Sequence, residues 1–248
     1  LTIPTPYNES IRDYLPGSPE KLSLKRQLQQ LGEASIEIPL IIGGKNIQTG
    51  EFGRCILPHN HARSIAKYHK GSTETVNQAI AAAAKARPAW ASMSWEARAA
   101  IFLKAADLLS KKYRPVINAA TMLNQSKTAM QAEIDAACEL IDFWRFNPSY
   151  MEQIFAQQPI SPPHMWNYME YRPLEGFVFA VTPFNFTSIA GNLPTSPAMM
   201  GNTVVWKPAS TAVYVAYWLM QLLKEAGLPD GVINMIPGNG GTIGEPAM

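Results

Sequence analysis

Three stretches near the carboxyl end of the chain decide the fold: Gly176-Phe-Val-Phe-Ala-Val-Thr-Pro-Phe-Asn-Phe186, Thr203-Val-Val-Trp-Lys-Pro208 and Val232-Ile-Asn-Met-Ile-Pro-Gly-Asn-Gly-Gly-Thr-Ile-Gly244. Each starts as a short apolar run and ends in polar or turn-forming residues, which is typical of buried parallel strands. Helical patterns over 188–200 and 211–226 separate them. Because parallel strands end at one edge of their sheet, and open α/β sheets bind ligands at that edge, we expect a functional site there.

The residues before position 176 predict a helical layer and a small antiparallel β meander. Apolar spacing and capping residues predict helices over 22–31, 94–113, 115–123 and 128–146. A further helix begins at Ser72, and Pro88 is expected to end it or to kink it. One strand is expected over 36–42, and the meander continues over 55–70. Residues 157–171 hold three prolines and several aromatic side chains, which favours an extended hairpin that projects from the body. The predicted class is α/β.

Composition excludes several classes of function. The 248 residues carry a net charge of +2, from 21 basic and 19 acidic side chains, so no basic field is available for nucleic acid or an anionic membrane. No apolar run approaches the ~18–20 residues of a membrane span. The first residues lack both the signal-peptide pattern and an initiator Met, so the start is expected to be processed or truncated.

Two polar residues follow the first two apolar strands. Asn185 follows a proline at a strand end, where a rigid side-chain amide can donate to a developing oxyanion; the alternative is an amide that merely satisfies the turn. Lys207 is the only charge in its strand, at a position where cofactor hydroxyls or phosphates would be met; the alternative is a lysine that extends to solvent.

The third strand runs into a glycine turn. Backbone N–H groups in Gly238-Asn-Gly-Gly-Thr-Ile-Gly244 can meet a phosphate at the start of a helix. The spacing GxGxxxG is one residue longer than the dinucleotide fingerprint, and no Lys-Ser/Thr follows, so the stretch is not a P-loop. A plain strand–helix turn fits the pattern equally well.

Other chemically capable residues favour structural roles. Asp135, Glu139 and Asp142 share one helical face, either as an acidic site or, more simply, as a solvated face. Cys55 and Cys138 form no CxxC pair and have no basic activator, which indicates structural thiols in a reducing compartment. No metal site is expected from the three histidines of the meander, His59, His61 and His69.

These motifs together resemble the aldehyde dehydrogenase superfamily. The resemblance rests on Thr182–Phe186, Trp206-Lys-Pro208 and the Gly238–Gly244 turn, which occur in the family's order and at its intervals. Longer blocks, among them Gln131-Ala-Glu-Ile-Asp-Ala-Ala137 and Tyr171-Arg-Pro-Leu-Glu-Gly-Phe177, are similar to the branch that oxidises L-glutamate γ-semialdehyde. The similarity begins near residue 15 and implies an incomplete Rossmann-like sheet.

The resemblance also implies roles for individual residues. Asn185 matches an oxyanion-hole asparagine, and Glu139 and Phe186 match positions that line the aldehyde pocket. NAD would contact a set of residues at the strand ends: Thr182, Pro183, Phe184, Lys207, Ser210, Gly240 and Gly244. Ser210 stands where many relatives have a glutamate on the cofactor ribose, so the choice between NAD and NADP stays open. Residues 157–175 match a hairpin through which subunits of the family associate into homo-oligomers.

The family's nucleophilic cysteine and general-base glutamate would lie beyond residue 248. We therefore expect an amino-terminal fragment, itself inactive, of an NAD-dependent enzyme of proline catabolism. Its expected parts are 1–156, with the meander and helices, the hairpin 157–175, and the truncated strand–helix units 176–248. Alternatives are a non-catalytic nucleotide-binding or interaction module and an aldehyde dehydrogenase of other specificity. The expected compartment is the cytoplasm, or alternatively the mitochondrial matrix.

Overall fold

The computed structural model, which describes residues 3–248, contains a five-stranded mixed sheet in the order β3-β2-β8-β7-β6. Strands β6 (Val178–Val181), β7 (Val204–Lys207) and β8 (Ile233–Met235) are parallel neighbours, as the three apolar runs predict. Their carboxyl ends therefore lie at one edge of the sheet. The predicted α/β class is confirmed.

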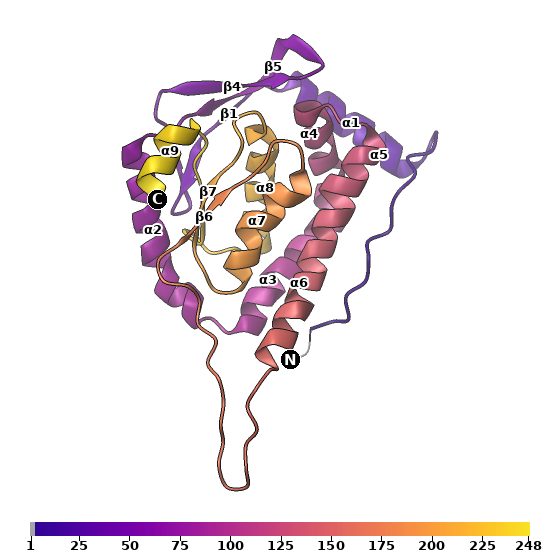
Figure 1. The fold of residues 1–248 in the computed structure, drawn as a ribbon. Helices are drawn as coiled ribbons and strands as arrows, with labels where there is room; N and C mark the ends of the chain where they lie inside the picture. Colours follow the sequence, from indigo (N-terminus) through magenta and orange to yellow (C-terminus); the bar gives the residue numbers. More distant parts are fainter. Residues whose placement is uncertain (1–2) are drawn as a thin grey trace.

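Helices cover both faces of this sheet, which is why strand β7 is buried along its whole length. Val205 of β7 packs in a cluster with α2 (Thr73–Ser92) and α9 (Gly240–Ala247). Its neighbours Val204 and Trp206 join the larger core on the opposite face, with α7 (Thr187–Met199) and α8 (Val213–Ala226). Figure 1 shows the two helix pairs on either side of the strands. The alternation follows from the two-residue period of a β-strand.

A second helical layer packs outside α7 and α8. It consists of α1 (Pro19–Glu33), α3 (Trp95–Leu108), α4 (Arg114–Gln125), the short α5 (Ala129–Ala132) and α6 (Leu140–Phe155). Two π-helical segments, η1 (Leu109–Tyr113) and η2 (Glu133–Glu139), connect α3 to α4 and α5 to α6 without a break. Helix α2 runs through Pro88 to Ser92, so Pro88 does not end the helix, and the alternative of a kink at that proline stays a prediction.

The expectation of one strand over 36–42 is also wrong, because Pro39 divides it. Strand β1 (Ile36–Ile38) pairs parallel to β5 (Asn60–His69) in a three-stranded sheet with β4 (Phe52–Leu57). Strand β2 (Leu40–Ile42) joins the five-stranded sheet, antiparallel to both β8 and β3 (Lys45–Ile47). Proline has no N–H to donate to a ladder, so it interrupts a strand. The division at residues 156 and 175 stays a prediction, although β2 and β3 complete the sheet of 176–248.

The π-helical segment η2 rotates the side chains of the predicted helix 128–146. Ile141 and Trp144 are fully buried as expected, but Ile134 of the same predicted apolar face is 47% exposed. A π-helix adds a residue to a helical turn, so side chains before and after it no longer share one face. Asp135 consequently turns into the protein, with 4% exposure, and is not part of a solvated acidic face.

Residues 157–175 project from the body as two extended segments joined at their tip (Figure 1). The projection is as expected, but the segment contains no β-strand. Side chains link the two extended segments instead: Gln158 Oε1 accepts from Met169 N at 2.7 Å, and Ser161 Oγ accepts from Asn167 N at 2.9 Å. Large apolar side chains on these segments face solvent, including Ile160 at 91% and Trp166 at 81% exposure.

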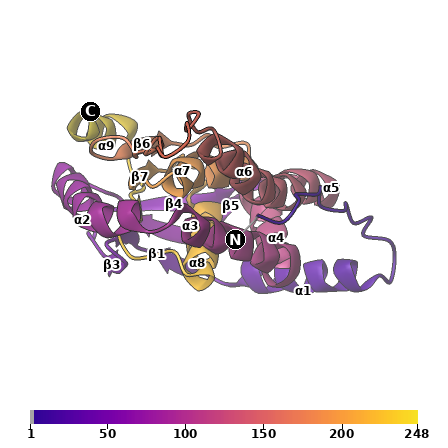
Figure 2. The same cartoon turned by 90° about the horizontal axis from the view of Figure 1, so that it is seen from below.

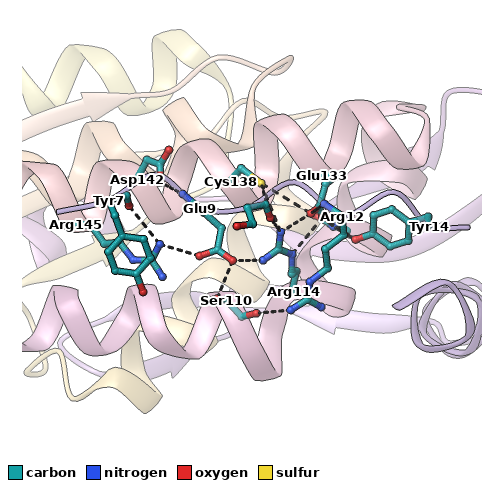
Figure 3. A network of polar contacts seen from close by, with 12 residues as sticks. Tyr7, Glu9, Arg12, Tyr14, Ser110, Arg114, Glu133, Cys138, Asp142 and Arg145 are labelled. Atoms are coloured by element: carbon teal, nitrogen blue, oxygen red, sulfur yellow. Dashed lines mark hydrogen bonds and ion pairs between the residues drawn. The ribbon is translucent and has the colours of Figure 1, made fainter. Parts of the chain in front are cut away.

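The N-terminal segment runs along the helical layer from α6 to α1 (Figures 1 and 2). Glu133 of η2, which has no exposed surface, forms an ion pair with the buried Arg114 and accepts from Tyr14 OH at 2.6 Å. Arg114 also pairs with Glu9 at 2.5 Å, and Arg145 reaches the same carboxylate at 2.7 Å (Figure 3). We call this set the arm network; it fixes residues 7–14 to the helices.

Candidate functional site

The segments that follow the three parallel strands meet at one edge of the sheet, which we call the strand-end rim (residues 182–186, 207–210 and 237–244). Thr182 N donates to Lys207 O at 3.2 Å, and Ile236 N donates to Trp206 O at 2.8 Å. Ser210 Oγ donates to Gly238 O at 3.1 Å. These contacts show that the three strand ends lie together at one edge, as expected, whereas the site residues and their roles stay predictions.

The first segment of the rim presents a polar side chain between two aromatic ones. Asn185 is exposed and forms no hydrogen bond within residues 3–248. Phe184 and Phe186 beside it are 64% and 42% exposed. Thr182 differs, because it is buried and its Oγ1 accepts from the indole of Trp206 at 2.9 Å. Pro183 is half-buried between them. The side chain of Asn185 therefore does not satisfy the turn, and the structural alternative for it fails.

Helix α7 begins directly after this segment, and its first N–H groups are capped from another helix. Phe186 provides no capping side chain. Asp135 of η2 does so instead: Oδ2 accepts from Thr187 N at 3.0 Å and Oδ1 from Ser188 N at 3.1 Å. Sequence reasoning missed this function, because a cap that comes from a distant helix leaves no local spacing signal.

Lys207, in the second segment, is 8% exposed and has one hydrogen-bond partner among the described residues, the carbonyl of Pro208 at 3.2 Å. No carboxylate of residues 3–248 pairs with it. Burial lowers the pKa of its ammonium below the ordinary value, since low-polarity surroundings disfavour the charged form. The alternative of a lysine extended to solvent is excluded. A buried cation with two unused N–H donors is suited to an anionic or hydroxyl-bearing ligand.

The third segment is an open helix start. Asn239 caps α9 by accepting from Gly241 N at 3.0 Å, while the N–H groups of Gly240 and Thr242 find no acceptor in the described part of the chain. A Cβ at Gly238 would lie 3.0 Å from the side chain of Ile243, so protein packing leaves little room for a larger residue there. A Cβ at Gly240 or Gly244 would meet no protein atom within 4 Å. The space over these two glycines is therefore free for a ligand.

The two residues expected to line the aldehyde pocket lie in separate surroundings. Glu139 borders a surface cavity of about 680 Å³ between η2, α6 and the N-terminal segment. Phe186 lies under the ammonium of Lys127, 4.7 Å from its ring centre. No hydrogen bond or ion pair within residues 3–248 joins Glu139 to another side chain, so its carboxylate is available for a ligand. Both assignments stay predictions.

The two cysteines and His69 have structural surroundings. Cys55 and Cys138 are buried, and burial raises the pKa of each thiol to about 12, so neither forms a thiolate at neutral pH. His69 is buried; Nδ1 accepts from Thr49 N at 3.0 Å, and Nε2 lies 2.7 Å from Glu37. Within residues 3–248 no three His, Cys, Asp or Glu side chains gather as a metal site would need. None of the described helices has the length and apolarity of a membrane span.

Comparisons with known proteins agree with this geometry. A delta-1-pyrroline-5-carboxylate dehydrogenase of Agaricus bisporus is 52% identical over 238 residues, 95% of this chain and 44% of the relative. A mitochondrial protein of the same name from Dictyostelium discoideum is 46% identical over 98% of this chain and 44% of its own length. The chain thus spans less than half the length of these curated relatives.

A solved structure and a family model extend the comparison. The delta-pyrroline-5-carboxylate dehydrogenase of Mycobacterium tuberculosis bound with NAD superposes with a TM-score of 0.96 and 51% identity, covering 99% of this chain and 46% of that one. The model of the aldehyde dehydrogenase family matches residues 47–248. The chain therefore belongs to the aldehyde dehydrogenase family.

Proposed function

We propose that the full-length protein carrying this chain oxidises L-glutamate γ-semialdehyde, the open form of 1-pyrroline-5-carboxylate, to L-glutamate with NAD. The observation that carries the proposal is the convergence of Asn185, Lys207 and the open α9 start at one rim. Relatives at 46–52% identity are named for the same substrate, which supports the choice among aldehydes. This oxidation would be a step of proline catabolism.

The rim fits the cofactor that was crystallised with the Mycobacterium relative. Lys207 would donate to a ribose hydroxyl with N–H groups that the protein leaves unused. The free N–H groups of Gly240 and Thr242 would meet the pyrophosphate, at the positive end of the α9 dipole. Ser210 and the backbone at Thr182, Pro183 and Phe184 would complete the wall. When bound, NAD would accept the hydride of the aldehyde.

Asn185 would provide one donor to the oxygen of the aldehyde as it gains negative charge. Its amide is free of protein partners and follows a rigid strand end, which suits a preorganised donor. Glu139 and Phe186 would bind the rest of the substrate. The nucleophile and the general base are expected beyond residue 248, because Cys55 and Cys138 are buried thiols. Residues 1–248 alone are therefore expected to be inactive.

The test is the steady-state rate of NAD reduction by the full-length protein. We expect L-glutamate γ-semialdehyde to be oxidised with a higher kcat/KM than a simple aliphatic aldehyde. Asn185→Ala should lower kcat by about 10²–10³-fold and leave the NAD dissociation constant unchanged, because it removes one oxyanion donor. Equal losses in kcat and NAD affinity would contradict the oxyanion role.

The same measurements separate the two alternatives. NAD binding without turnover of any aldehyde would indicate a nucleotide-binding or interaction module. Turnover that favours aliphatic aldehydes would indicate an aldehyde dehydrogenase of other specificity.

We further propose that residues 157–175 associate with a second copy of the protein. The exposed side chains include Ile160, Met165 and Trp166, which would otherwise stay in water. The extended segments also form no backbone ladder of their own, so they can pair with a strand of a neighbouring subunit. Replacing Ile160 and Trp166 by serine should lower the mass measured by analytical ultracentrifugation. Two buried free thiols suit a reducing compartment, either the cytoplasm or the mitochondrial matrix. Several relatives are named as mitochondrial proteins.

A further inference from the structure

We propose that Asp135, paired with Lys127, is a positioning residue that holds the turn Asn185–Phe186 in the orientation needed for oxidation. The inference rests on the proposed function, since it concerns how the oxyanion donor is held. It assigns a role to a carboxylate that touches neither substrate nor cofactor.

Asp135 uses both carboxylate oxygens on the start of α7. Besides the N–H groups of Thr187 and Ser188, Oδ1 accepts from Ser188 Oγ at 2.7 Å. These N–H groups are among the four at a helix start that have no partner within the helix. Because the carboxylate is 4% exposed, water competes little for these bonds. The backbone two residues after Asn185 is therefore fixed by a side chain from another element.

Lys127 contacts both Asp135 and the aromatic ring of Phe186 in the turn. Its Nζ lies 2.5 Å from Asp135 Oδ2 and 4.7 Å from the ring centre of Phe186. The ammonium is mostly buried, so it neutralises the carboxylate in a poorly solvated place. The pair consequently contacts the backbone after Asn185 and the face of Phe186 together.

Other contacts at the α7 start do not replace this hold. Thr121 Oγ1 and Gln125 Nε2 reach the hydroxyl of Thr187, at 2.9 and 3.0 Å. Both leave the N–H groups of the helix start to Asp135. Because Asn185 has no side-chain partner among the described residues, its direction follows from the backbone that Asp135 fixes. Misplacement of a catalytic group by about 1 Å can cost 10²-fold in rate.

The test is a double-mutant cycle in the full-length protein, measured as single-turnover rates with L-glutamate γ-semialdehyde and NAD. Asp135→Ala should lower the rate by about 10-fold to 10²-fold and leave the NAD dissociation constant unchanged. In the Asn185→Ala background the same substitution should cost less than about twofold, because its effect passes through Asn185. Equal costs in both backgrounds would overturn the proposal.

Matched variants keep the outcome readable. Lys127→Arg preserves the ion pair and should retain the rate, whereas Lys127→Met should reproduce part of the Asp135 loss. Glu225→Gln removes another hydrogen-bonded carboxylate, on α8 beside Lys112, and should have no effect. If Asp135→Ala lowers the folded yield, the cycle is run with Asp135→Asn, whose amide oxygen still accepts one bond from α7.

The two proposals fail in different ways. A wild-type protein without semialdehyde oxidation would contradict the proposed function. An active wild-type protein with additive losses in the cycle would contradict the positioning role alone.

Discussion

Buried charges in the arm network are paired with opposite charges, whereas the buried charge at the strand-end rim is not. In the arm network Arg114 is paired with Glu9 and Glu133, and Glu133 also accepts from Tyr14 and Asn118. At the rim Lys207 is also buried, with 8% exposure, but has one carbonyl as its partner. A buried cluster whose charges are paired holds elements together, whereas an unpaired buried cation costs stability and offers donors to a ligand.

This contrast indicates where stability and function should agree and where they should conflict. Removing Arg114 from the arm network leaves Glu133 buried without a cation. Removing Lys207 relieves such a charge and also removes a contact to the cofactor. Functional groups are often retained at a cost in stability. The four predictions below test this contrast.

The largest effect is expected from Arg114→Met. The substitution leaves Glu133 buried and without its cation, which typically costs about 3–5 kcal/mol of unfolding free energy. Thermal and denaturant unfolding of the full-length protein should both shift strongly to lower midpoints. Lys111→Met removes an exposed i,i+4 pair with Asp107 and should leave the midpoint unchanged. Equal midpoints for the two variants would mean that the arm network adds no stability.

The same network should make the protein acid-sensitive. Burial alone would raise the pKa of Glu133, but hydrogen bonds from Arg114 and Tyr14 outweigh it and hold that pKa below the ordinary 4.5. The pKa of Glu9 is lowered in the same way. A carboxyl with a lowered folded pKa stabilises the protein above its unfolded pKa, and this stability is lost as the pH falls toward the folded pKa.

The denaturation midpoint should therefore fall as the pH drops below 4.5, with a smaller fall in Arg114→Met. The measurement is thermal denaturation across this range. A fall of the same size in Arg114→Met would place the acid-sensitive groups elsewhere.

Lys207→Met should separate stability from function. The substitution keeps most of the length of the side chain and removes a buried ammonium, so the denaturation midpoint should rise slightly. NAD affinity should fall by about 10–100-fold, as for loss of a hydrogen bond from a charged donor. Calorimetric titration and thermal denaturation give the two values. Lys224→Met, at an exposed site on α8, should change neither. Loss of stability in Lys207→Met would break the contrast between the two regions.

The smallest effect is expected at the glycine turn. Asn239→Ala removes the cap of α9, which costs about 0.5–2 kcal/mol of helix stability. NAD affinity should fall by a few-fold, because the N–H groups of Gly240 and Thr242 lose their fixed direction. Asn239→Ser keeps a capping oxygen and should restore most of both. An unchanged affinity in Asn239→Ala would argue against a cofactor at this turn.

The rim was predictable from the sequence because its signals are local. Apolar runs that end in Thr182-Pro183, Lys207-Pro208 and Pro237-Gly238 mark buried strands and their ends. Parallel pairing then places all three ends at one edge.

Features that depend on tertiary contacts were not predictable in this way. Pro39 signals an interruption, but nothing local assigns β1 and β2 to different sheets. The extra residue of η2 leaves the sequence helical in pattern while it rotates Ile134 out and Asp135 in. The pairing of Asp135 with α7 spans more than 50 residues, so no spacing rule reveals it.

The most direct test of the account is hydrogen exchange of the full-length protein with and without saturating NAD. We predict slower exchange at residues 182–186, 207–210 and 237–244 together, since one ligand would cover all three segments of the rim. The arm network at residues 7–14 should exchange at the same rate in both states. Protection of the arm network or of residues 157–175 without protection of the rim would contradict the account.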